Sequence, residues 1–267
     1  MSTDDLGSVK GAYPFRVGVT SRCGAAPVVA TVEAWRWKVD DVLVHLESGE
    51  VLPGEAEIAR ARALAEEALL SFTAQLPDDL ALAAEDDARR EESVERAATA
   101  VRRLAPLGPR CFILRLDPPP AGGADAAWEE RVARSLARIS ERTGVAAGFF
   151  AVENGAYDFA IAARVLSRLG LSACSDIGLL YGYERDVAAH LAAHLFRSRA
   201  VHLHMARDGR LHLPASEMPV DHLHGLLSFL LERHFQSVLT LEVLTEEDFD
   251  SSIKALARAR DWVRKER

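Results

Sequence analysis

Short apolar runs alternate with longer stretches of helical spacing along almost the whole chain, and this alternation restricts the fold more than any other feature of the sequence. The apolar runs have the length and character of buried strands, which in parallel sheets are rich in Val, Ile and Leu on both faces. There are eight of them, at residues 15–20, 42–47, 71–76, 111–117, 148–154, 172–176, 200–204 and 238–243.

A stretch in which Ala, Leu, Glu and Arg recur at helical spacing follows each run. The predicted helices lie near 28–37 and at 54–68, 86–104, 124–142, 159–169, 187–196, 221–233 and 246–265. Repeated strand–helix units favour a parallel sheet. The 267 residues also match a (β/α)8 barrel, which typically has about 250. We therefore predict the α/β class and a single TIM barrel at 13–267 after a flexible N-terminus at 1–12, with an open doubly wound sheet as the alternative.

Charge and cysteine content narrow the possible partners. The formal net charge is −8, whereas nucleic acids and anionic membranes bind basic surfaces. Cys23, Cys111 and Cys174 lie far apart, unlike the cysteines of a disulfide framework or a zinc ribbon. The chain starts without the apolar core of a signal peptide, and no apolar run is long enough to span a membrane. We expect a cytoplasmic protein that binds a small molecule, but neither nucleic acid nor membrane, and whose oligomeric state stays open.

Four consecutive predicted strands end in groups that can bind a metal. In a TIM barrel the active site lies at the carboxyl ends of the strands. Strands five and six end in Glu153 and Asp176, strand seven in His202 and His204, and strand eight in Glu242. A buried carboxylate is costly unless it is paired or bound to a metal. These residues predict a site for a divalent ion such as Mn, Zn, Fe or Mg.

The two histidines of strand seven point the same way, because alternate residues of a strand share a face. We favour His204 as the ligand, since it lies nearest the strand end, and keep His202 as a candidate. For any single residue, a structural ion-pair network is the more common explanation. Four strand ends that are far apart in the sequence all carry groups able to bind a metal, and this favours the metal site. Glu153 and Glu242 are the catalytic candidates.

The chain also resembles a known group of barrels. AVEN, SDIG, VHLH and LTLEV look like the signatures of strands five to eight in the xylose-isomerase-like superfamily, which contains sugar-phosphate isomerases and epimerases and the endonuclease IV class. A closer resemblance, to the cobamide-remodelling phosphodiesterases (the CbiR family), rests on YPFRVGVTS, KVDDVLVHLES, QLPDDL, SDIGLLYG, VHLHMARDGRLHL and HFQSVLTLEV. It covers residues 13–243 and implies a metal-dependent hydrolase that cuts the phosphodiester of the corrinoid nucleotide loop.

Four positions depart from that resemblance. Gln75, Arg115 and Leu179 stand where these families usually have metal-binding histidines, and Leu211 precedes His212 where an Asp-His pair is expected. What the resemblance then implies is nearer to the one-metal set of the sugar isomerases and epimerases than to the three-metal set of endonuclease IV.

Arg115 has two interpretations. A guanidinium does not bind a cation, but it is well shaped to hold a phosphate oxygen or a carboxylate of a substrate. A salt bridge from Arg115 to Glu153 or Asp117 is about equally expected, because Arg is the usual partner of a buried acid. The substrate-binding candidates at the strand ends and in the loops that follow are Gln75, Arg115, Glu47, Arg22 and His212.

Three functions remain open on the sequence. The leading hypothesis is metal-assisted hydrolysis of a phosphodiester in a cobamide. The first alternative is isomerisation or epimerisation of a sugar or sugar phosphate, in which Glu153 and Glu242 exchange protons at carbons beside a carbonyl. The second is a ligand-binding barrel that has lost its reaction through the four substitutions.

Overall fold

Eight parallel strands close into a barrel in the computed structural model, which describes residues 7–24, 27–119 and 126–266. Within these residues the strand order around the barrel is β1-β10-β7-β6-β5-β4-β3-β2, and β1 closes the ring against β10. The strands are β1 (Arg16–Thr20), β2 (Asp41–His45), β3 (Ser71–Gln75), β4 (Phe112–Leu114), β5 (Phe150–Glu153), β6 (Ser172–Asp176), β7 (Ser198–Leu203) and β10 (Val238–Leu241). The predicted TIM barrel is confirmed, and the open sheet is wrong because β1 and β10 pair.

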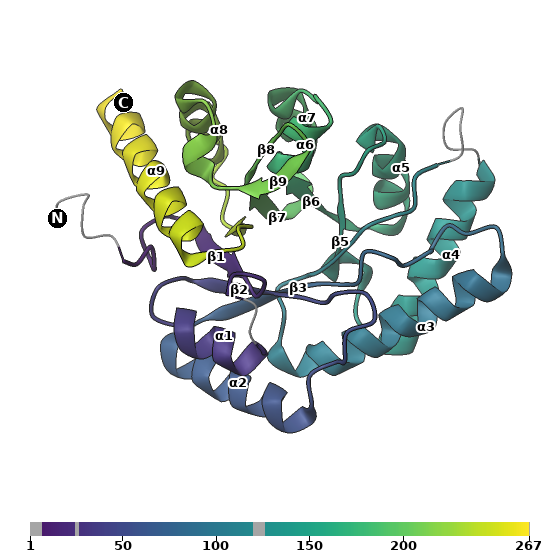
Figure 1. The fold of residues 1–267 in the computed structure, drawn as a ribbon. Helices are drawn as coiled ribbons and strands as arrows, with labels where there is room; N and C mark the ends of the chain where they lie inside the picture. The colour runs from purple at the N-terminus through teal and green to yellow at the C-terminus, as the bar shows by residue number, and fades with distance from the viewer. Residues whose placement is uncertain (1–6, 25–26, 120–125, 267) are drawn as a thin grey trace.

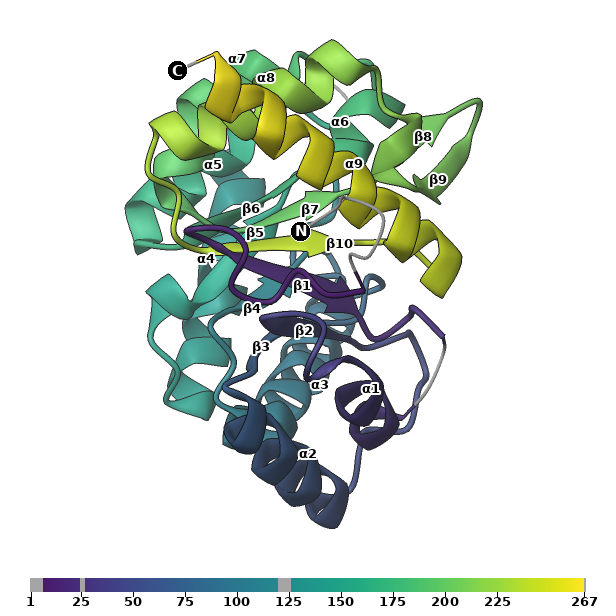
Figure 2. The same ribbon diagram turned by 90° about the vertical axis from the view of Figure 1, so that its left-hand side faces the viewer.

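The longer helices surround the strands (Figures 1 and 2). They are α1 (Val28–Trp35), α2 (Glu55–Ala68), α3 (Asp87–Leu104), α4 (Ala126–Thr143), α5 (Phe159–Leu169), α7 (Val187–His194), α8 (Val220–Glu232) and α9 (Glu246–Lys265), with single 3-10 turns η2 (Ala105–Leu107), η3 (Ala147–Phe149), η4 (Leu195–Arg197) and η5 (Ala215–Glu217). N-cap side chains fix several starts: Asp86 accepts a hydrogen bond from the Ala88 amide at 2.9 Å. None of the described helices combines the length and the apolar character needed to cross a membrane.

Strand β4 is shorter than the sequence predicts. A strand is expected at 111–117, but the observed ladder covers only Phe112–Leu114. Pro118 and Pro119 follow closely, and proline has no N–H with which to extend a ladder. Arg115 is therefore the first residue beyond the strand. Residues 120–125 of the loop that follows lie outside the described residues.

Two short elements near the barrel's carboxyl end were not predicted. Helix α6 (Ile177–Gly182) starts directly after β6, and an antiparallel hairpin of β8 (Met205–Arg207) and β9 (Arg210–Leu213) follows β7. The hairpin turns at Asp208 and Gly209, whose φ angles are 53° and 75°. Asp-Gly is a strong signal for such a turn, because both positions need a positive φ. The sequence therefore carried a local signal for this hairpin.

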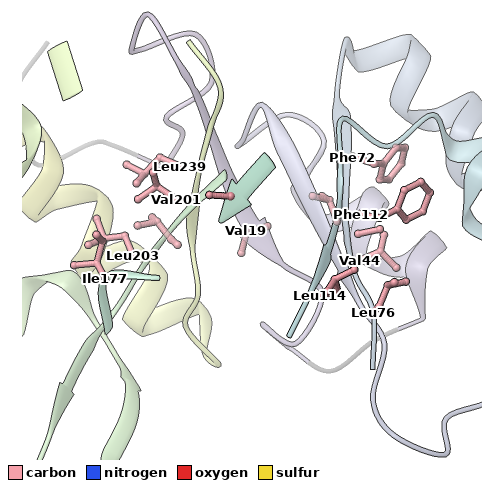
Figure 3. Close-up of a cluster of buried hydrophobic side chains, with 14 of the residues drawn as sticks. Val19, Val44, Phe72, Leu76, Phe112, Leu114, Ile177, Val201, Leu203 and Leu239 are labelled. Atoms are coloured by element: carbon pink, nitrogen blue, oxygen red, sulfur yellow. The ribbon is translucent and has the colours of Figure 1, made fainter. Parts of the chain in front are cut away.

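Alternate residues of each strand face the helices or the barrel interior. In β2, Val42 and Val44 pack into the large core between strands and helices, part of which Figure 3 shows, while Leu43 packs inside the barrel. The interior cluster comprises Leu43, Cys111, Ile113, Ala151, Cys174 and Ala200. Residues two positions further along these strands turn to the same interior side at its carboxyl end, namely His45, Arg115, Glu153, Asp176 and His202.

The N-terminal residues 7–12 lie against the barrel. Val9 is buried, and its amide donates to the Lys38 carbonyl at 2.8 Å. The Gly11 amide donates to the Asp40 carboxylate at 2.9 Å. Hydrogen bonds thus hold this half of the segment that was expected to be flexible, whereas residues 1–6 lie outside the described residues. The domain boundary at residue 13 stays a prediction.

Candidate metal centre

Five predicted ligands lie together at the carboxyl end of the barrel. Glu153 ends β5, Asp176 ends β6, His202 lies in β7, and His204 and Glu242 directly follow β7 and β10. The ladder places Asp176 opposite His202. All five are 0–1% exposed, although three are carboxylates and two are imidazoles. Parallel strands bring their carboxyl ends to one rim, so the alternation in sequence produces this cluster directly.

The two imidazoles connect the three carboxylates. Nδ1 of His202 lies 2.8 Å from Oε1 of Glu153, 3.4 Å from Oε2 of Glu242 and 4.0 Å from Oδ2 of Asp176. Nε2 of His204 lies 3.2 Å from Oδ1 of Asp176 and 3.8 Å from Oε2 of Glu242. Each imidazole thus faces at least two carboxylates.

Several of these atoms are buried without a hydrogen-bond partner. Both ring nitrogens of His202 and Oε2 of Glu242 are in this state. The short contact from His202 to Glu153 therefore lacks hydrogen-bond geometry, and such buried polar atoms cost free energy unless something pairs with them. Nitrogen and oxygen lone pairs that converge without bonding one another are what a divalent ion requires. The residues present fit the predicted ion.

Glu153 belongs to a different group of ligand atoms from the one that contains Asp176 and Glu242. The candidate ligand atoms of Asp176, His202 and Glu242 all lie within 4.8 Å of one another, and Glu153 forms a similar group with Cys174 and His202. We call Asp176, His204 and Glu242, which the His204 contacts join, the outer triad. Glu153 was predicted as a ligand together with these residues. In the structure it contacts His202, which in turn contacts Glu242 of the outer triad.

His204 is held by its backbone surroundings. Its Nδ1 accepts a hydrogen bond from the His212 amide at 3.1 Å and also lies 3.3 Å from the Met205 carbonyl. These backbone contacts orient the ring so that Nε2 faces the Asp176 carboxylate. The ring packs on the first turn of α6, where a Cβ on Gly178 would lie 1.9 Å from Cε1 and 2.1 Å from Nδ1 of His204. Only glycine at position 178 leaves room for the His204 ring where it lies.

We expect Gly178→Ala to displace His204 and weaken metal binding. The added methyl cannot coexist with the ring in its present place, because the separations from the ring atoms would be far below van der Waals contact. Removing a metal site's orienting partner typically lowers affinity by about 10–100-fold. Calorimetric titration with Mn²⁺ measures the effect. The matched control is Gly225→Ala on α8, where an added Cβ meets nothing within 4 Å and metal affinity should not change.

Arg115 lies beside Glu153, as one of the two sequence-based interpretations proposed. It donates from Nε to Oε2 of Glu153 and lies 2.8 Å from Asp78 through Nη1. The predicted alternative partner, Asp117, is wrong: its carboxylate accepts the Ala83 amide at 2.8 Å instead. Burial by itself would raise the pKa of Glu153, but the guanidinium outweighs it and holds this pKa at about 2.

The metal-free centre holds protons that an ion would displace. Burial disfavours the charged form of His204, but the Asp176 carboxylate prevails and raises its pKa to about 9. Burial also acts to raise the pKa of Glu242, and the neighbouring His202 and His204 lower it instead. At neutral pH the centre is therefore a set of carboxylates neutralised by imidazolium.

Binding of a divalent ion at pH 7 should release about one proton from His204, since only a neutral imidazole can coordinate. Because the pKa of about 9 is raised above its usual value, the proton competes at neutral pH and is lost as pH rises through 9. Mn²⁺ affinity should accordingly increase with pH up to about 9. Calorimetry in two buffers of different ionisation enthalpy measures the released protons, and His204→Gln should release none at this step. Proton-free binding by the unchanged chain at pH 7 would contradict this assignment.

The remaining predicted residues line the approach to the centre. Nε of Arg22 lies 3.1 Å from Glu47, and its Nη1 lies 3.3 Å from Nε2 of His212, whose Nδ1 lies 3.1 Å from the Glu242 carbonyl. The ring centroids of His212 and His204 are 4.7 Å apart. Arg22 and Glu47 also line a cavity of about 750 Å³ at the ends of β1 and β2. His45 also lines this cavity, whereas none of the five predicted ligands does.

The substituted positions have different surroundings. Gln75 ends β3 and is buried, with neither amide atom hydrogen-bonded. Leu179 is buried in α6, and its amide donates to Asp176 at 2.8 Å. Leu211 lies on β9 and is 44% exposed. Gln75 therefore retains unused polar atoms beside the site, whereas Leu179 offers only its backbone.

Three residues near the centre were not among the predicted site residues. His45 ends β2 opposite Gln75, is buried, and lines the cavity. The sequence predicted that this strand ends two residues later, at Glu47, so His45 was not considered as a strand-end residue. Asp78 pairs with Arg115 from a loop, for which no periodic signal exists. Cys174 lies in β6, and its neighbours Glu153 and His202 come from the two adjacent strands.

Comparison with known proteins agrees with the fold. The family model described as xylose isomerase-like TIM barrel matches residues 32–266. No curated protein matches the chain. Among solved structures, a D-tagatose 3-epimerase-like protein is similar with a TM-score of 0.76 and 16% identity, covering 94% of this chain and 99% of that one. Endonuclease IV from Thermus thermophilus has a TM-score of 0.72 and 21% identity over 92% and 99% of the two chains. A D-allulose 3-epimerase from Methylomonas sp. has a TM-score of 0.69 and 16% identity over 94% and 96%. At these identities the likeness shows the fold alone.

Proposed function

The chain belongs to the xylose isomerase-like TIM barrel family, and from that premise we propose that it is a metal-dependent isomerase or epimerase of an uncharged sugar. The observation that carries the proposal is the pair of buried glutamates, Glu153 and Glu242, which enter from β5 and β10 and face the same nitrogen of His202 at 2.8 and 3.4 Å. Asp176, His204 and Glu242 would hold the ion, with Glu153 as a further ligand or a second proton-transfer group.

Proton transfer at a carbon beside a carbonyl accounts for these groups. A bound divalent ion would supply Lewis-acid chemistry, polarising the carbonyl and hydroxyl oxygens of the sugar. Glu242 can act as a base through Oε2, which is buried and has no hydrogen-bond partner. Glu153 is ionised and oriented by Arg115, with Oε1 still directed to the centre. One glutamate suffices to move a proton between neighbouring carbons, and two on opposite faces permit inversion at one carbon.

The charge around the centre supports an uncharged substrate. Arg22 pairs with Glu47, Arg115 pairs with Glu153 and Asp78, and Arg207 of the hairpin pairs with Glu217. A phosphate group that bound to one of these three arginines would have to displace its carboxylate partner. Buried carboxylates on the other side of the site would repel it as well. Hydroxyl groups of a neutral sugar meet neither obstacle.

Hydrogen exchange from carbon tests this function directly. The protein is incubated with Mn²⁺ and a panel of unphosphorylated ketoses and aldoses in D₂O, and deuterium on carbon is followed by NMR. We expect solvent deuterium at the carbon beside the carbonyl of at least one sugar, together with its isomer or epimer. No exchange with any sugar under any divalent ion would remove the proposal.

Hydrolysis of a cobamide phosphodiester is the second candidate, favoured by the order of the motifs SDIGLLYG, VHLHMARDGRLHL and LTLEV at the strand ends. Here Arg115 would leave Asp78 to neutralise charge developing on the phosphoryl oxygens. Mass spectrometry of a complete cobamide incubated with the protein and Mn²⁺ detects release of the nucleotide loop. Release without any carbon exchange replaces the first proposal by this one, and absence of both reactions favours a ligand-binding barrel.

A further inference from the structure

Cys174 lies one layer deeper in the barrel than the outer triad. It precedes Asp176 by two residues in β6, so both side chains turn to the interior. Its ladder partner in β7 is Ala200, two residues before His202, and Glu153 of β5 pairs with Cys174 itself. The strand register therefore places a thiol between a carboxylate and an imidazole.

The contacts within this group are those of potential ligands. The Cys174 thiol donates a hydrogen bond to Oε1 of Glu153 across 3.9 Å, and the ligand atoms of Glu153, Cys174 and His202 all lie within 4.8 Å of one another. We call these three residues the inner triad. All are 0–1% exposed, and neither ring nitrogen of His202 has a hydrogen-bond partner. Nδ1 of His202 lies 2.8 Å from Oε1 of Glu153 without hydrogen-bond geometry, so a thiol, a carboxylate and an imidazole converge in a way that core packing alone does not explain.

Cys111 provides the internal comparison. It belongs to the same interior cluster as Cys174 and is also fully buried. It is absent from the groups of ligand atoms found among the described residues. Apolar packing accounts for Cys111, whereas Cys174 has the additional polar neighbours.

We propose that the inner triad is a second metal position, selective for thiophilic ions such as Zn²⁺ or Cd²⁺, beside the harder site at the outer triad. Thiolate ligands favour zinc and softer ions, whereas carboxylate-rich sites also take Mn²⁺ and Mg²⁺. As the sulfur–metal bond forms, the thiol proton passes to solvent, and no electron is transferred. Glu153 serves here through Oε1, because Oε2 is held by Arg115.

This inference concerns ion selectivity and does not depend on which reaction the site performs. If no sugar exchanges hydrogen but a sulfur ligand to the metal is found, the proposed function is refuted and the inner triad is supported. If deuterium exchange occurs with Mn²⁺ but no sulfur ligand is found, the metal position at the inner triad is refuted and the proposed function is supported.

X-ray absorption on the zinc-loaded protein tests the proposal without any variant. We expect a sulfur neighbour at about 2.3 Å, the usual zinc–thiolate distance. Cys174→Ser should lose this neighbour and bind one equivalent of Zn²⁺ fewer, while its uptake of Mn²⁺ stays unchanged. Cys111→Ser, at an equally buried thiol, is the matched control and should retain the sulfur signal.

Cobalt gives an independent readout. Co²⁺ bound by the unchanged protein and by Cys111→Ser should show thiolate-to-metal charge-transfer absorption, which Cys174→Ser should lack. A zinc-loaded wild-type protein with only nitrogen and oxygen neighbours would overturn the proposal, as would a sulfur signal that survives in Cys174→Ser.

Discussion

Glu242→Gln should weaken Mn²⁺ binding by about 100-fold or more and strongly slow the proton transfer that depends on this glutamate. The substitution removes a charged ligand from the outer triad, and changes to groups that only support a ligand already lower metal affinity by about 10–100-fold. It also removes the proposed base, whose loss lowers rates by about 10²–10⁴-fold. Calorimetric metal titration and deuterium exchange measure the two effects separately.

The control for this substitution is Glu47→Gln at the same rim. Glu47 has a side chain that is 58% exposed and paired with Arg22, so its replacement should leave Mn²⁺ affinity nearly unchanged. Equal losses in the two variants would mean that rim charge in general, and not coordination by Glu242, attracts the ion.

Arg115→Ala should destabilise the metal-free protein by about 3–5 kcal/mol, because breaking a buried ion pair leaves an uncompensated charge. The charge left behind is Glu153, whose carboxylate is fully buried while the Arg115 side chain is 30% exposed. The guanidinium holds the pKa of Glu153 at about 2. Its contribution to stability is thus present above the usual pKa of a glutamate and is lost as pH falls toward 2. The difference between the two proteins should accordingly shrink in acid.

Thermal and chemical unfolding with and without metal complete this experiment. A divalent ion supplies positive charge to the same carboxylates, so saturating Zn²⁺ or Mn²⁺ should recover part of the stability lost in Arg115→Ala. Arg22→Ala, which breaks a partly exposed pair with Glu47, should cost no more than about 1 kcal/mol. If both variants melt alike, Arg115 does not compensate a buried charge.

The alternation of apolar runs and helical stretches was sufficient to predict the barrel fold. Eight apolar runs, each followed by a helical stretch, predict eight βα units, and the structure closes them into one ring. Local chemistry changed the details: Pro118 and Pro119 follow a shortened β4, and the Asp208–Gly209 turn makes a hairpin where a loop was expected.

The two-residue period of strands also predicted much of the site. It turns Glu153, Asp176 and His202 inward at the strand ends, because each follows an interior residue by two positions. The period cannot predict contacts that depend on packing between strands or on loop conformation. The proximity of Cys174 to Glu153 follows from register, and the Arg115–Asp78 pair follows from a loop path.

Anomalous diffraction from crystals soaked in Mn²⁺ decides whether the outer triad is a metal site. We expect one manganese peak at the carboxyl end of the barrel, in contact with Asp176, His204 and Glu242. Crystals that remain without a peak there at saturating Mn²⁺, with His204 still bridging Asp176 and Glu242, would contradict the metal site and leave these residues as a structural ion-pair network.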